Sequence, residues 1–186
     1  MVDSTPPESE WPLLESETEY ENDWYRGGYD LVEQPDGSRK RYYWAGLPPA
    51  VVVIAVHDGE VIFVEQYRPP VRHTQLELPA GLVEDDESYE TAGARELREE
   101  TGFDPGRVDL LQDVWVATGL LRHRRGTVFA DDLEPGEPAL EGNEFLTVRR
   151  VPADEAIDRA RAQPTNDATV EGLLLAMADG YLPSPA

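Results

Sequence analysis

The chain has 186 residues, a length that suits one domain with its own hydrophobic core. Its formal net charge of −22 argues against nonspecific binding to nucleic acid or to anionic membranes. The absence of cysteine excludes disulfides and thiolate metal sites. The longest strongly apolar run, residues 50–56, is too short to cross a bilayer. We therefore expect a cytoplasmic protein that binds neither nucleic acid nor membranes.

The basic residues are almost all arginine, because Lys40 is the one lysine among 16 basic residues. An acidic, lysine-poor composition is typical of proteins from salt-accumulating cells. At about 1 M salt the Debye length is roughly 3 Å, so the repulsion within such a surface is strongly screened. The composition thus favours a halophilic protein, and the alternative is an ordinary acidic protein.

The N-terminal part of the chain predicts a tail followed by a hairpin. Residues 1–12 are acidic and contain proline, which predicts a flexible acidic tail. Segments 29–34 and 39–45 read as two strands, and Asp36-Gly37 between them is a strong hairpin signal. Residues 13–47 are therefore expected to form a small N-terminal antiparallel β region that precedes the main domain, residues 48–186.

The main domain alternates between strand-like and helix-like patterns. Apolar segments predict strands, and two C-terminal segments predict helices, the second capped by Asn166 or Asp167 and stopped by Gly180. The predicted strands are 50–56, 61–67, 75–79, 108–117, 126–130 and 145–150, and the helices are 153–163 and 166–180. Together with a mid-chain helix, this order predicts an α/β (α+β) fold, a mixed sheet covered by helices.

The mid-chain helix is expected to begin near Asp86 or Ser88 and to end at Gly102. Three glutamates, Glu96, Glu99 and Glu100, fall within one arc of about 100° on this helix. Like charges at this spacing repel, and a bound Mg²⁺ or Mn²⁺ would offset the repulsion. The alternative is a solvated surface helix stabilised by charge pairs.

The segment "GLVEDDESYETAGARELREETGF", residues 81–103, resembles the Nudix box throughout its length. The matching positions are Gly81, Glu87, Arg95, Glu96, Leu97, Glu99, Glu100 and Gly102, and Phe103 takes the last aliphatic position. The resemblance implies the Nudix α/β/α sandwich with a mixed sheet. It also implies Mg²⁺-dependent hydrolysis, with Mn²⁺ possible, of a nucleoside diphosphate linked to another moiety.

The resemblance also assigns roles to residues of the box. Glu96 and Glu100 would be the main metal ligands, Glu99 a further ligand or partner, and the carbonyl of Ala80 would join them. Glu87 and Arg95 lie about two helical turns apart and could form an orienting ion pair.

The flanking segments resemble the ADP-ribose pyrophosphatase branch of this family over roughly residues 13–182, including "VEQYRPPVRHTQLELPAGLVE". That branch implies conversion of ADP-ribose to AMP and ribose 5-phosphate by a homodimer whose N-terminal sheets exchange. The chain departs from it at Thr118, where proline is expected. The alternatives are another nucleotide sugar, a dinucleotide, an oxidised nucleotide, or a non-catalytic nucleotide-sensing module.

The same resemblance places a general base in the loop "LEGNEF", where Glu144 fits best and Glu141 is the reserve, with Glu99 as a further possibility. Candidate substrate-binding residues are the arginines that could hold phosphate and an aromatic residue that could stack on a base. They are Arg68, Arg122, Arg39, Arg41 and Trp24.

Overall fold

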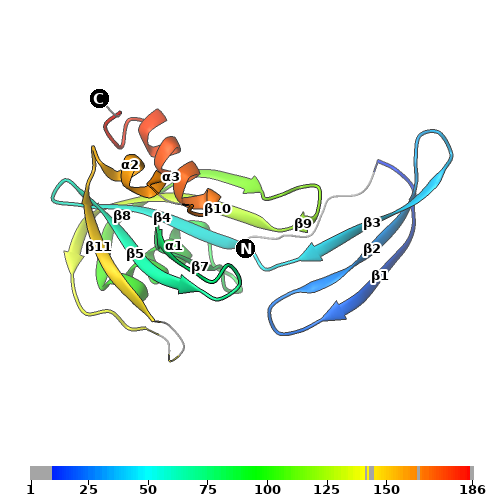
Figure 1. Ribbon diagram of the computed structural model, residues 1–186, viewed down its shortest axis with the longest axis horizontal. Helices are drawn as coiled ribbons and strands as arrows, with labels where there is room; N and C mark the ends of the chain where they lie inside the picture. Colours follow the sequence, from blue (N-terminus) through cyan, green and yellow to red (C-terminus); the bar gives the residue numbers. More distant parts are fainter. Residues whose placement is uncertain (1–9, 141, 143–144, 163, 185–186) are drawn as a thin grey trace.

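The computed structural model describes residues 10–140, 142, 145–162 and 164–184 (Figure 1). The strands in these residues are β1 (Leu13–Glu21), β2 (Arg26–Glu33), β3 (Arg39–Gly46), β4 (Ala50–His57), β5 (Glu60–Arg68), β6 (His73–Glu77), β7 (Ala80–Leu82), β8 (Phe103–Trp115), β9 (Leu121–Arg122), β10 (Arg124–Pro135) and β11 (Leu146–Pro152). The helices are α1 (Tyr89–Thr101), α2 (Ala156–Arg161) and α3 (Asp167–Ala178). None of these helices has the length and apolar composition needed to span a membrane.

The larger sheet has the strand order β11-β5-β4-β10-β8, with β6 paired to β5 and β7 paired to β4. β4 and β10 run parallel, whereas β8 and β11 pair antiparallel with their neighbours. Helix α1 covers one face of this mixed sheet, and α2 and α3 cover the other (Figure 1). The predicted mixed sheet between helices is confirmed.

The apolar run of β4 explains why both faces are covered. Val51 and Val53 pack in one core cluster with residues of α1, whereas Val52 and Ile54 pack in the other with residues of α2 and α3. Full burial of each such side chain stabilises the fold by about 1.5–3 kcal/mol. A strand that is apolar at every position therefore needs a helix layer on each side.

The smaller sheet has the order β1-β2-β3-β9 and extends to one side of the larger one (Figure 1). The predicted hairpin is confirmed: β2 and β3 pair antiparallel, and Gly37 has φ 80° in the turn. Only two residue pairs join β3 to β9 among the described residues.

Strand β1 was not predicted as a strand. Its sequence, LLESETEYE, has no alternation of apolar and polar residues, and every residue in it is exposed. The strand pairs with β2 along its length. The carbonyl of Pro12 also accepts a hydrogen bond from the backbone N–H of Glu33, so the last part of the predicted tail is joined to this sheet.

Several boundaries differ from the prediction. β8 begins at Phe103, directly after the helix, and ends at Trp115, so the predicted strand 108–117 begins too late and runs two residues too far. The predicted strand 126–130 lies within the longer β10, which pairs with β8 as far as Pro135. The predicted helix 153–163 is shorter, since Ala153 bonds through its backbone N–H to the carbonyl of Gly59 and thus lies in a turn.

Candidate active site

Helix α1 begins and ends where the sequence predicts. Ser88 is the N-cap, and its hydroxyl accepts a hydrogen bond from the backbone N–H of Thr91 at 3.2 Å. Gly102 ends the helix in the left-handed region, with φ 79°, where glycine carries no steric penalty. A Cβ on Gly93 would lie 2.7 Å from Val128, so glycine allows α1 to pack closely on the sheet.

Two glutamates of α1 meet the backbone of β7. Glu100 accepts a hydrogen bond from the backbone N–H of Ala80 at 3.1 Å. A Cβ on Gly81 would lie 2.0 Å from the carboxyl carbon of Glu96, so this carboxylate rests directly on the Gly81 backbone. Glu96 is 9% exposed and Glu100 is 4% exposed. Two carboxylates are thus held, buried, at one place on the large sheet.

Arg95 links the remaining carboxylates of the box. Its guanidinium donates to both oxygens of Glu87 at 3.0 Å, which is the predicted ion pair. It also donates to Glu96 at 2.7 Å and to Glu99 at 3.1 Å. The hydrogen bonds from Arg95 lower the pKa of Glu87, and the same pairing raises the pKa of Arg95. Arg95 therefore reduces the repulsion that the sequence places on this helix.

The donors at the α1–β7 junction suit a hard divalent cation. Mg²⁺ typically binds one or two protein carboxylates and keeps the rest of its shell for water and substrate phosphates. Within the described part of the chain, no group of three or more acidic or histidine side chains is arranged to hold a metal ion. Glu96 and Glu100, beside the Ala80–Gly81 backbone, are two carboxylates of the kind that Mg²⁺ binds.

Arg68 lies at the end of β5 and pairs with an acid. Its Nε and Nη2 both donate to Oε2 of Glu77, at 2.9 Å and 2.6 Å. Among the predicted substrate residues, Arg68 lies on the large sheet that carries the glutamate site.

The other predicted substrate residues lie on strands of the smaller sheet or in the turn between two of them. Trp24 lies in the turn between β1 and β2, Arg39 pairs with Glu33, and Arg41 lies over the ring of Tyr29. The strand that carries both Arg39 and Arg41, β3, extends away from α1 (Figure 1). Glu141 and Glu144, the predicted bases, lie outside the described residues.

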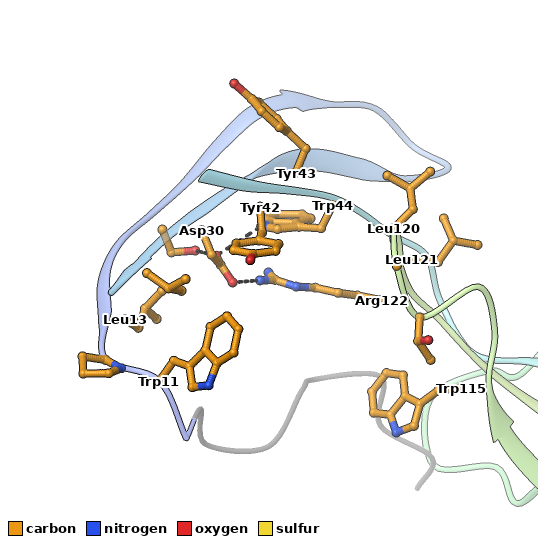
Figure 2. Close-up of a pocket in the computed structure, with 15 residues that line it drawn as sticks. Trp11, Leu13, Asp30, Tyr42, Tyr43, Trp44, Trp115, Leu120, Leu121 and Arg122 are labelled. Atoms are coloured by element: carbon orange, nitrogen blue, oxygen red, sulfur yellow. Dashed lines mark hydrogen bonds and ion pairs between the residues drawn. The ribbon is translucent and has the colours of Figure 1, made fainter. Parts of the chain in front are cut away.

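Arg122 lines an open pocket of about 1040 Å³ between the smaller sheet and the β8–β9 segment. Its guanidinium pairs with Asp30 and lies 3.9 Å from the ring centroid of Trp44. Figure 2 shows Trp11, Leu13 and Tyr42 on one side of this pocket and Trp115, Leu120 and Leu121 on the other. The lining of the pocket is therefore mainly aromatic and apolar, and it includes the partly buried ion pair of Arg122 with Asp30.

Sequence reasoning missed several residues of these sites. Asp30 bonds to Ser16, to Trp44 and to Arg122, but an acid within a strand pattern gives no indication of three partners. Glu77 was also missed, although the sequence contains a signal for it. It stands between the apolar residues Leu76 and Leu78, and this alternation indicates that its side chain lies on the opposite face of the strand from theirs.

Several known proteins are similar to this chain in sequence or in fold. ADP-ribose pyrophosphatase of Bacillus subtilis (strain 168) is 31% identical over 140 residues, which are 74% of this chain and 76% of that protein. ADP-sugar pyrophosphatase of Mus musculus is 36% identical over 125 residues, which are 61% of this chain and 57% of that protein. A crystal structure of an ADP compounds hydrolase has a TM-score of 0.83 and 23% identity, and the match covers 96% of this chain and 100% of that one, so the fold is shared.

The profile of the NUDIX domain matches residues 46–173, more than half of the chain. The matched range contains β7 and α1, whose glutamates meet at Ala80 and Gly81. On this match and this geometry, the chain belongs to the Nudix hydrolase family.

Proposed function

We propose that the protein hydrolyses ADP-ribose to AMP and ribose 5-phosphate in a reaction that requires Mg²⁺, with Mn²⁺ as a possible substitute. The observation that carries the proposal is the convergence of Glu96 and Glu100 on the Ala80–Gly81 backbone within a Nudix domain. The choice of ADP-ribose rests on the similarity to the Bacillus subtilis ADP-ribose pyrophosphatase. The similarity to the mouse ADP-sugar pyrophosphatase supports other ADP-sugars as a second candidate.

In this proposal Glu96, Glu100 and the Ala80 carbonyl hold the cation, with Glu99 as a further ligand or partner. The cation, when bound, neutralises the charge of the diphosphate and makes water more acidic. Arg95 and Glu87 fix the orientation of the helix carboxylates, because Arg95 contacts Glu87, Glu96 and Glu99 together.

A substrate panel tests the proposal. ADP-ribose, other ADP-sugars, dinucleotides, oxidised nucleotides and nucleoside triphosphates are each incubated with the protein and Mg²⁺, and the products are separated by chromatography. We expect ADP-ribose to have the highest kcat/KM and to yield AMP and ribose 5-phosphate. A clear preference for a substrate without an ADP moiety would refute the assignment, and no turnover of any compound would favour a nucleotide sensor.

The general base is proposed to lie in the loop before β11. Changing Glu144 to glutamine should lower kcat by about 10²-fold or more with little change in KM, the usual scale for loss of a general base. Changing Glu141 to glutamine should cost less. Steady-state kinetics of both variants tests this assignment. A larger loss of kcat in the Glu141 variant would make Glu141 the base, and an unchanged kcat in both variants would make Glu99 the next candidate.

The smaller sheet is proposed to contact a second copy of the chain, so that residues 13–47 serve dimerisation and residues 48–186 form the catalytic domain. β1 is exposed along its whole length, and large apolar side chains lie uncovered on this sheet. They include Trp11, Leu13, Leu14, Tyr20, Trp24, Tyr25, Tyr42 and Tyr43. Exposed apolar surface of this kind marks an interaction site, and a partner would also bring Trp24, Arg39, Arg41 or Arg122 to a substrate site.

Light scattering is expected to give twice the mass of one chain. Tyr20 and Tyr67 are equally exposed, at 53% and 54%, but only Tyr20 lies on the smaller sheet. Changing Tyr20 to arginine should therefore shift the protein towards monomer, whereas the same change at Tyr67 should leave the dimer intact. A monomeric wild type at micromolar concentration would overturn this proposal.

The acidic surface is proposed to be a halophilic adaptation. With a net charge of −22, repulsion between surface carboxylates should destabilise the fold when salt is removed. Thermal unfolding followed by circular dichroism should thus show a much lower Tm at about 0.05 M KCl than at about 1 M KCl. An unchanged Tm would indicate an ordinary acidic protein.

A further inference from the structure

Glu77 and Arg68 form an ion pair of unequal exposure. The side chain of Glu77 is 3% exposed, whereas that of Arg68 is 41% exposed. The acid is therefore buried in the protein while the guanidinium reaches the surface. Two N–H groups of Arg68 bond to a single carboxylate oxygen, which fixes the plane of the guanidinium. These bonds use Nε and Nη2, and the side chain of Arg68 is 41% exposed, so the Nη1 edge of the guanidinium faces a region that a ligand can reach.

The pair stands on the face of the sheet that carries α1. Glu77 is paired with Val64 and Arg68 with His73, so β5 and β6 present Arg68 and Glu77 on the same face. Ile62, at an alternate position of β5, packs in the core cluster with α1. Leu76 and Leu78, which flank Glu77, pack instead in the cluster with α2 and α3. Alternation along the strand therefore directs Glu77 and Arg68 towards the side of Glu96 and Glu100.

The backbone after Glu77 leads directly to the glutamate site. Leu78 N–H donates to the hydroxyl of Thr169, and the carbonyl of Pro79 accepts a hydrogen bond from Val53, so this segment is held at two successive residues. Ala80 follows, and its N–H bonds to Glu100. A rigid segment of four residues thus joins the acid that holds Arg68 to the backbone that meets the metal-site carboxylates.

We propose that Glu77 is a positioning residue that holds the Arg68 guanidinium beside the α1–β7 junction, where its free edge binds the diphosphate of the substrate. The proposal rests on the proposed function, because it takes the substrate to be a diphosphate. It explains how a chain of charge −22 binds an anion: a long, flexible arginine is held in one orientation by an acid that is itself buried. Without the acid, Arg68 would sample many rotamers and bind phosphate less well.

A double-mutant cycle tests this role. Changing Glu77 to glutamine keeps the size of the side chain and removes its charge. We expect KM to rise about tenfold, the effect of one charge-assisted hydrogen bond, with kcat changed by less than about twofold. In a background with Arg68 changed to glutamine, the same change at Glu77 should have no further effect on KM, because Glu77 acts through Arg68.

A matched control lies on β5, the strand that carries Arg68. Glu65 pairs with Arg149 at 2.7 Å, and its side chain points to the opposite face of β5. Changing Glu65 to glutamine should leave KM unchanged. Thermal melts verify that each variant is folded. The variant with both Glu77 and Arg68 changed has no unpaired buried acid, because both charges of the pair are removed together.

The outcomes separate this inference from the proposed function. The double-mutant cycle is measured with whichever diphosphate the substrate panel shows to be hydrolysed. If the protein does not hydrolyse ADP-ribose but hydrolyses another diphosphate, only the assignment of ADP-ribose as substrate is refuted. A rise in KM that is equally large with and without Arg68 would overturn the positioning role, as would an unchanged KM in the folded Glu77 variant. For a protein without turnover, binding of inorganic pyrophosphate with Mg²⁺, measured by calorimetry, replaces KM in the same cycle.

Discussion

Replacing Glu96 or Glu100 with glutamine is expected to lower kcat/KM about 10³-fold while the protein stays folded. Both side chains are buried and lie against the Ala80–Gly81 backbone. Glutamine has the same shape and can still accept a hydrogen bond, so the packing of α1 on β7 should survive. It carries no charge, however, and binds Mg²⁺ much more weakly than a carboxylate.

The matched control for these variants is Glu90 changed to glutamine. Glu90 lies in the first turn of the same helix, more than one turn before Glu96 and Glu100. Its variant should keep the activity of the wild type within about twofold, the level expected when no site interaction is lost. Rates are measured over a range of Mg²⁺ concentrations, and wild-type rates in either site variant at saturating Mg²⁺ would contradict the metal site.

Changing Gly81 to alanine is expected to reduce kcat/KM at least about 10²-fold with only a small loss of stability. The added Cβ would lie 2.0 Å from the carboxyl carbon of Glu96 and 2.1 Å and 2.3 Å from its oxygens. The clash involves the end of a flexible side chain, so the fold can adapt by moving the carboxylate. This movement displaces the charge that the site needs, and a displacement of about 1 Å is enough to impair catalysis.

Gly27 offers a control for the loss of a glycine. A Cβ on Gly27 would meet its nearest atom, the carbonyl oxygen of Trp44, at 3.8 Å, an ordinary contact. Changing Gly27 to alanine should therefore leave activity unchanged. Kinetics and thermal melts of both variants decide the matter: full activity with alanine at position 81 would show that the position of the Glu96 carboxylate does not limit the reaction.

The fold was predicted best where local signals are strong. The capping residues Ser88 and Gly102 define α1, and the fully apolar β4 predicts a strand buried on both faces. β1 gave no such signal, since every residue in it is exposed. It is held to β2 by backbone pairing and by side-chain hydrogen bonds, such as those from the hydroxyl of Tyr29 to Glu15 and Glu17. A strand that buries no apolar face has no hydrophobic periodicity to detect.

The candidate site divides in the same way. The clustering of Glu96, Glu99 and Glu100 on α1 follows from helical spacing, which the sequence contains. Glu87 precedes the N-cap Ser88, so its pairing with Arg95 depends on the loop that leads into the helix. The burial of Glu96 against Gly81, the partner of Arg68 and the pocket beside Arg122 depend on how distant strands meet. Such contacts are set by the tertiary structure and leave no fixed spacing in the sequence.

Direct binding of Mn²⁺ tests the central claim, that Glu96 and Glu100 form the metal site at Ala80–Gly81. The electron paramagnetic resonance signal of free Mn²⁺ is followed while wild-type protein or a variant is added. The wild type and the Glu90 variant should bind the ion and reduce this signal, and the variant with both Glu96 and Glu100 changed to glutamine should leave it unchanged. Equally tight binding by that double variant would show that the metal site lies elsewhere in the protein.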